Sequence, residues 1–227
     1  MKLLLNTQFN IYELSLMTAP NVRKFREFVE DIPSRRDRVL IQLLYLTAAK
    51  VSEVTTKVTP YDLKNQLSKP YGQYLDYSFD DYEKQKVFLI KLAVAQKRVK
   101  RKNQLPYFKV VALPTILQYE PWTYDLLTWV RDSHEHKLSF DLTRNRVYSI
   151  IRNRLRALDP TVRPHSVRQW RIAHLAALYG FTPYDIAAYT GSTVQTGFSQ
   201  IDMNEELVDT FLNVTWKQYF PKLLRQI

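Results

Sequence analysis

His165 and Arg168 stand three residues apart at the expected start of a helix, directly after Pro164. Residues at this spacing lie on one side of a helix, so the two side chains could face the same ligand. Arginine binds phosphate oxygens bidentately, and histidine moves protons near neutral pH. The pair therefore fits a phosphodiester, although His165 taken alone is better explained as a helix-capping or core histidine. Further along, Arg171 adds a cation, and His174 falls on the apolar side, where we expect a structural role.

Two other stretches concentrate positive charge. A helix from Arg144 to about Leu158 is predicted to carry five arginines on its polar face, with Arg152 and Arg156 as candidate phosphate contacts, unless that face is simply solvated. Two apolar, strand-like segments flank a run in which five of six residues are cationic, which predicts a β-hairpin with a basic tip. Such a tip is often merely solvated or guards a sheet edge, but its density favours phosphate contact by Lys97, Arg98, Lys100, Arg101 and Lys102.

Three segments follow one another in a recognisable order. Residues 38–54 form an apolar helix that ends in Lys-Val-Ser-Glu. The basic hairpin precedes a Val-Val-Ala-Leu-Pro strand at 110–114, and residues 164–180 begin Pro-His-Ser-Val-Arg. Together, over about residues 20–215, they resemble the catalytic domain of tyrosine recombinases and phage integrases. The resemblance implies that fold, which is mainly helical with a small antiparallel β-sheet (α+β).

The resemblance also implies roles for individual residues. In that family, cations hold the scissile phosphate while a tyrosine attacks it. His165 and Arg168 match retained family positions, and Lys50 stands where the first catalytic arginine belongs. Lysine keeps the charge but lacks the planar fork of arginine, so a bidentate clamp is not reproduced there. The family's hairpin lysine has three candidates here: Lys97, Lys100 and Lys102.

Two departures remove the rest of the family chemistry. Ser192 replaces the second histidine, and Ile201 stands near the expected place of the nucleophile, in a stretch (193–202) without tyrosine. An isoleucine cannot form a phosphotyrosyl link. We therefore expect a degenerate family member that binds double-stranded DNA as a regulator or accessory factor of recombination or integration, without strand transfer.

Two alternatives stay open at this point. An active recombinase is possible if the nucleophile has moved to Tyr189 or Tyr219, the latter in a C-terminal helix through which such proteins can self-associate. A protein-interaction domain is possible if the fold has abandoned DNA, with the tyrosine-rich segment 61–82 as its contact surface.

Hydrophobic periodicity predicts the elements that position these residues. A single recombinase-like domain is expected over 20–227, after an arm at 1–19, and residues 60–83 receive no assignment. The predicted strands are 86–94 and 106–114. The predicted helices are Val22 to Glu30, Arg35 to about Thr55 with Ser34 as N-cap, Trp122 to Arg131, Thr143-capped to about Leu158, about Ser166 to Tyr179, Pro183 to Tyr189, and Asn204 to Tyr219.

Composition limits the function classes. The 227 residues include 33 Lys and Arg against 22 Asp and Glu, a net charge of +11 that attracts polyanions. The absence of cysteine excludes disulfides and thiolate chemistry, and four scattered histidines predict neither a metal site nor a cofactor. The opening apolar run is too short for a signal peptide, and no segment is long enough to span a membrane. An intracellular, non-secreted DNA-binding protein is expected.

Overall fold

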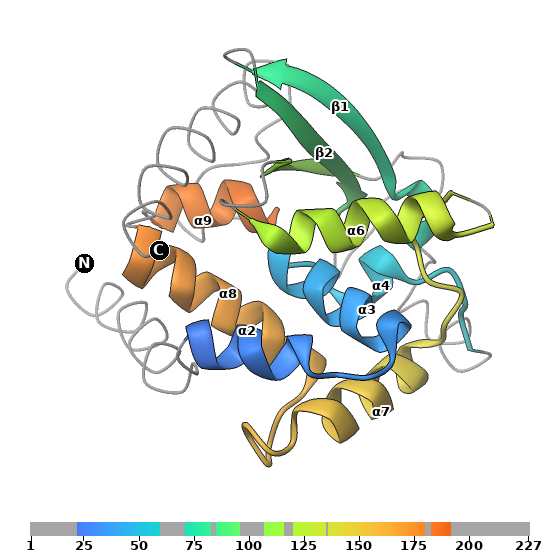
Figure 1. Ribbon diagram of the computed structural model, residues 1–227, viewed down its shortest axis with the longest axis vertical. Coiled ribbons are helices and arrows are strands. Elements are labelled where there is room, and N and C mark those ends of the chain that lie inside the picture. The colour runs from blue at the N-terminus through green and yellow to red at the C-terminus, as the bar shows by residue number, and fades with distance from the viewer. Residues whose placement is uncertain are drawn as a thin grey trace.

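The protein is mainly helical with one small antiparallel sheet, which confirms the α+β class (Figure 1). The computed structural model describes residues 22–59, 71–82, 85–95, 107–115, 120–134, 136–179 and 183–191. The expected arm at 1–19 and the expected helix Asn204 to Tyr219 lie outside these ranges. In chain order the elements are α2 (Val22–Glu30), α3 (Arg35–Leu46), α4 (Val51–Val54), the 3-10 helix η1 (Tyr71–Tyr74), β1 (Asp76–Tyr82), β2 (Gln85–Ala93), β3 (Phe108–Pro114), α6 (Pro121–Asp132), α7 (Arg144–Leu155), α8 (Pro164–Tyr179) and α9 (Pro183–Thr190).

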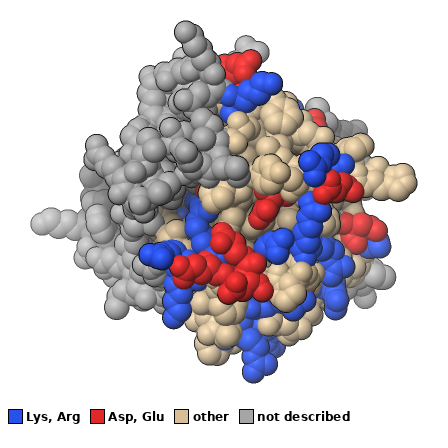
Figure 2. All heavy atoms as spheres, viewed as in Figure 1, with Lys and Arg blue, Asp and Glu red and all other residues tan. Residues whose placement is uncertain are grey.

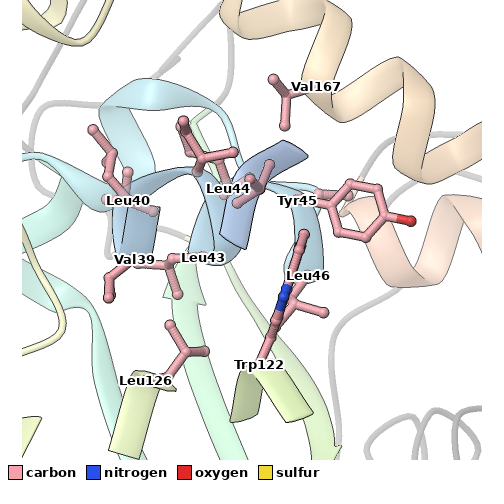
Figure 3. Packing of buried hydrophobic residues seen from close by; sticks show 14 of the residues in the cluster. Val39, Leu40, Leu43, Leu44, Tyr45, Leu46, Trp122, Leu126 and Val167 are labelled. Carbon is pink, nitrogen blue, oxygen red and sulfur yellow. The ribbon is translucent and has the colours of Figure 1, made fainter. Parts of the chain in front are cut away.

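Helix α3 runs through the middle of the core. All its residues from Val39 to Leu46 are buried. Trp122 and Leu126 of α6 lie on one side of it, and Val167 of α8 lies on the other (Figure 3). Burial of one such aliphatic side chain contributes roughly 1.5–3 kcal/mol. This packing fixes the start of α8, where His165 lies.

The sheet has the order β1-β2-β3, and both pairs of neighbours are antiparallel. The predicted strands 86–94 and 106–114 are confirmed as β2 and β3 to within two residues. Their register places Leu92 opposite Lys109. Strand β1 lies in the segment without a predicted element, and most of its side chains are exposed. The hairpin tip between β2 and β3 lies outside the described residues.

The prediction of one continuous helix from Arg35 to about Thr55 is wrong, because the helix is interrupted after Leu46. Helix α3 ends at Leu46, Ala48 takes a left-handed conformation (φ 46°), and α4 starts at Val51. The Glu53 carboxylate accepts the backbone N–H of Lys50 at 2.9 Å, which closes the first turn of α4. The break leaves the carbonyls after Leu46 without helical partners, and buried cations bind them, as described below.

The other helix ends differ from the prediction by a few residues. Ser34 and Thr143 act as N-caps as predicted, each accepting a backbone N–H with its side chain. Helix α7 ends at Leu155 instead of about Leu158, and α8 begins at Pro164 instead of Ser166, with proline in the first turn. Within the described part of the chain, none of the helices has both the length and the apolar composition needed to cross a membrane.

Candidate functional site

Four basic side chains from separate parts of the chain share one electrostatic neighbourhood beside the α3–α4 break. Partial burial lowers the pKa of His165, and the charges of Arg168 and Lys50 lower it further. The same two charges act on the pKa of Lys109, although burial is the larger cause there. Lys109 and Arg168 share the carbonyls of Ala48 and Thr190 as acceptors, and Glu53 contacts both Lys109 and the Lys50 backbone. His165 lies one helical turn before Arg168, so the four groups lie close together. Lys50 comes from the α3–α4 connection, Lys109 from β3 and the other two from α8.

Arg168 ties α8 to the C-terminal ends of two other helices. Its side chain is nearly buried, with 7% of the residue exposed. Nη1 donates to the Ala48 carbonyl at 2.5 Å, just after α3, and Nη2 donates to the Thr190 carbonyl at 3.3 Å, at the end of α9. A cation is favourable where helix carbonyls lack partners. These bonds use two of the five guanidinium N–H groups.

Lys109 lies beneath this arginine and shares its acceptors. The Lys109 ammonium is fully buried and donates to the carbonyls of Thr47 (2.8 Å), Ala48 (3.4 Å) and Thr190 (3.5 Å). Its Nζ lies 3.7 Å from Oε2 of Glu53. Burial lowers the pKa of Lys109 to about 7, an effect that Glu53 opposes and the neighbouring cations strengthen. Lys109 is thus a buried cation held by a carboxylate and three carbonyls.

Glu53 and Lys50 join this cluster to the end of β2. Besides the Lys50 backbone N–H, the Glu53 carboxylate accepts the N–H of Ala95 at 2.9 Å. The Lys50 ammonium donates to the carbonyl of the same Ala95 while its side chain remains exposed. The sequence therefore folds the α3–α4 connection directly onto the strand that leads into the basic hairpin.

The arrangement is suited to binding an anion. Lys50 and His165 are exposed, Arg168 lies just below them, and Lys109 lies deepest. In the part of the chain that the structure describes, the Glu53 carboxylate lies against Lys109 and the Lys50 backbone, and three cationic side chains (Lys50, Lys109 and Arg168) surround this one acid. Neighbouring like charges raise the free energy of the empty site, and a bound phosphate lowers it.

Arg171 does not lie where a DNA contact is expected. It is fully buried, with its guanidinium over the rings of Tyr45 (5.0 Å to the centroid) and Tyr189 (5.6 Å), and it donates to the Tyr189 hydroxyl at 3.1 Å. A side chain without exposed surface does not reach a duplex, so its position argues against the predicted contact. His174 is also buried, and its Nδ1 lies 2.7 Å from the Tyr45 hydroxyl, consistent with the structural role expected for it.

The candidate nucleophile Tyr189 is likewise a core residue. Its side chain is 1% exposed, and its hydroxyl donates to the carbonyl of Leu46 at the end of α3. Burial raises the pKa of this hydroxyl, and Arg171 opposes the rise. A buried hydroxyl that is already bonded to a backbone carbonyl is poorly placed to attack DNA. The other candidate, Tyr219, lies outside the described residues, as do Ser192 and Ile201.

Helix α7 presents cations at the surface, as the sequence predicts. Arg152 and Arg156 are exposed, whereas Arg154 pairs with the nearly buried Asp37 of α3, with Nε–Oδ2 at 2.9 Å. Figure 2 shows Lys and Arg side chains along the edge where Figure 1 places α7. On the same face, acidic side chains gather over α2, whose end carries exposed carboxylates at Glu27, Glu30 and Asp31. Helix α2 also carries Arg23, Lys24 and Arg26, so its charges balance, whereas α7 carries arginines and no acidic residue. A polyanion is therefore attracted towards α7 more than towards α2.

The predicted hairpin-tip contacts lie outside the described residues: Lys97, Arg98, Lys100, Arg101 and Lys102. Lys109, a strand residue that the sequence reasoning did not single out, occupies the cluster instead. Two signals were present in the sequence: Lys109 is a single charge inside the apolar run Tyr107–Leu113, and Glu53 is a single acid close to Val51 and Val54. Among the described residues, no group of three or more His, Asp or Glu side chains is arranged to hold a metal ion.

No protein-family model matches this chain, and no curated protein matches it.

Proposed function

We propose that this protein binds double-stranded DNA through the surface around Lys50, His165 and Arg168, on a fold of the tyrosine-recombinase catalytic-domain type, and that it lacks strand-transfer activity. The observation that carries the proposal is the convergence of these three residues with Lys109, from three separate segments of the chain. Arg168 and Lys109 bind carbonyls in the interior. Lys50, which also donates to the Ala95 carbonyl, and His165 are exposed above them and give a phosphate an approach.

Helix α7 supports a DNA-sized surface rather than a site for a single small anion. It packs against α4 and α8, the elements that border Lys50 and His165. Its exposed Arg152 and Arg156 thus extend the positive charge away from the cluster. Contacts of this kind bind phosphates and fix the position of a protein on the duplex without reading bases. The protein would act as a regulator or accessory factor of DNA recombination or integration.

The absence of catalysis in this proposal rests on the nucleophile. Ile201 stands near its expected place, and the Tyr189 hydroxyl is bonded in the core. Tyr219 is the remaining candidate. Incubation with a nicked duplex that traps phosphotyrosyl intermediates should give no covalent adduct. An adduct that maps to Tyr219 would establish the recombinase alternative.

DNA binding is tested by measuring duplex affinity over a series of salt concentrations. We expect Lys50→Gln, and the double variant Arg152→Gln with Arg156→Gln, to weaken binding and to flatten the salt dependence, by about one unit of slope for each lost phosphate contact. Lys86→Gln is the matched control, because Lys86 is exposed on β2 beside the β1–β2 turn and its loss changes the net charge equally. Absence of duplex binding at low salt, or equal weakening by Lys86→Gln and Lys50→Gln, overturns the proposal.

A further inference from the structure

The buried pair Arg171–Tyr189 links three helices at one point. Arg171 of α8 donates to the Tyr189 hydroxyl at 3.1 Å, and that hydroxyl donates to the carbonyl of Leu46, the last residue of α3. Tyr189 is the penultimate residue of α9. This one hydroxyl therefore attaches the end of α9 both to α8 and to the end of α3.

The residue after Tyr189 supplies a bond to the candidate site. The Thr190 carbonyl accepts Nη2 of Arg168 at 3.3 Å. Arg168 and Arg171 are three residues apart on α8, so they lie on the same side of that helix. Each arginine contacts the end of α9, Arg171 through a side chain and Arg168 through the adjacent backbone. The Arg168 junction is the nearer of the two to His165 along α8.

We propose that Tyr189 is a positioning residue for Arg168: its hydroxyl, held between Arg171 and the Leu46 carbonyl, fixes the last turn of α9 so that the Thr190 carbonyl orients the Arg168 guanidinium beside His165. Tyr189 does this without contacting DNA. The orientation of Arg168 by Tyr189 does not depend on DNA binding, whereas the effect of Tyr189 on DNA affinity rests on the proposed function. A phenylalanine at this position keeps the ring but removes both hydroxyl bonds, so the end of α9 is held less firmly and the Thr190 carbonyl is a less fixed acceptor for Arg168.

Tyr45 provides a matched control. Its ring is also fully buried and also lies under the Arg171 guanidinium, at 5.0 Å. Its hydroxyl, however, pairs with Nδ1 of His174 and interacts with Arg171, both on α8 and neither on α9. Tyr189→Phe and Tyr45→Phe therefore each remove one buried hydroxyl that interacts with Arg171, but only the first removes a hydroxyl that belongs to α9.

The first readout is the titration of His165 followed by NMR, with His165→Gln used to assign its resonance. The charge of Arg168 contributes to the lowered pKa of His165. In Tyr189→Phe we expect the pKa of His165 to move up towards its ordinary value, because Arg168 is no longer held beside it. In Tyr45→Phe the pKa of His165 should match that of the wild type. An unchanged pKa in Tyr189→Phe, or an equal shift in both variants, overturns the positioning role.

The second readout is duplex affinity at fixed low salt. Loss of one orienting hydrogen bond should weaken binding by Tyr189→Phe about five-fold, while Tyr45→Phe binds like the wild type. Equal duplex affinities of Tyr189→Phe and Tyr45→Phe would contradict a role of Tyr189 in DNA binding. If the wild type itself binds no duplex, the proposed function fails, and the His165 titration still decides the positioning role. If Tyr189→Phe does not fold, Arg171→Lys repeats both measurements, since it keeps the buried charge and alters the donor to Tyr189.

Discussion

The ammonium of Lys109 lies 3.7 Å from the Glu53 carboxylate, and both side chains are fully buried. Two ions removed from water lose solvation energy that their attraction restores only when additional hydrogen bonds satisfy them. Here three carbonyls accept from Lys109, and two backbone N–H groups donate to Glu53. The pair thereby connects the α3–α4 break, the end of β2 and the end of α9, and the first and last of these also support Arg168.

The stability of the fold should rise with pH from about pH 7 to about pH 10 because of Lys109. Its pKa is about 7 in the folded protein, against an ordinary value of 10.5. In this window the unfolded chain binds more protons than the folded one, so the free energy of unfolding increases with pH, by at most about 1.4 kcal/mol per pH unit. Urea unfolding at several pH values measures the slope. Lys109→Met should flatten it, and an equal slope in this variant would contradict the assignment.

Replacing one member of the buried Lys109–Glu53 pair should lower the free energy of unfolding more than replacing both. Lys109→Met leaves Glu53 without its cation and should lower the free energy of unfolding by about 3–5 kcal/mol. The double variant Lys109→Met with Glu53→Gln keeps side chains of similar size and leaves no buried carboxylate, so it should recover part of this loss. A double-mutant cycle of denaturation measurements gives the coupling energy. Strictly additive effects would show that the two groups do not interact.

Gly191 should tolerate no side chain. It follows α9 in a left-handed conformation (φ 63°), and a Cβ there would lie 2.6 Å from a methyl group of Val94. Gly191→Ala should therefore cost about 1–2 kcal/mol for the backbone alone, plus the clash. In a Val94→Ala background the clash is relieved and the backbone cost remains, so the same substitution should cost less but not zero. Equal costs in both backgrounds, measured by chemical denaturation, would contradict this contact.

The break between α3 and α4 could not be predicted from the sequence pattern. Apolar periodicity continues from α3 through Val51 and Val54, so a continuous helix is the natural prediction. What interrupts it is not local: the carbonyls of Thr47 and Ala48 bind cations that come from β3 and α8. A tertiary interaction between residues more than 60 positions apart leaves little trace in a window of one sequence.

The candidate site also contains residues whose places follow from local sequence and residues whose places do not. The spacing of His165 and Arg168 was sufficient to predict that they belong together, because helical geometry is local. Arg171 obeys the same spacing, yet it faces the core, since only the packing of α8 against α3 and α9 decides which side is buried. The buried Lys109 was hidden inside a correctly predicted strand, where a lone lysine ordinarily indicates a solvated position.

Strand β1 should lose its protection against pairing with another sheet when two aspartates are replaced. On this outer strand, the backbone N–H groups of Tyr77 and Asp81 donate to the carboxylates of Asp76 and Asp80, each at 2.8 Å. Charged side chains and occupied N–H groups discourage strand addition. Asp76→Val with Asp80→Val removes both, so sedimentation velocity should show self-association that increases with concentration. Ser78→Val adds a valine between the two aspartates without exposing a backbone N–H group, so it should behave like the wild type. Asp76→Asn with Asp80→Asn removes the negative charges but keeps the oxygen acceptors, so it separates the effect of charge from the effect of the hydrogen bonds. A double valine variant that sediments like Ser78→Val would show that the carboxylates do not protect this edge.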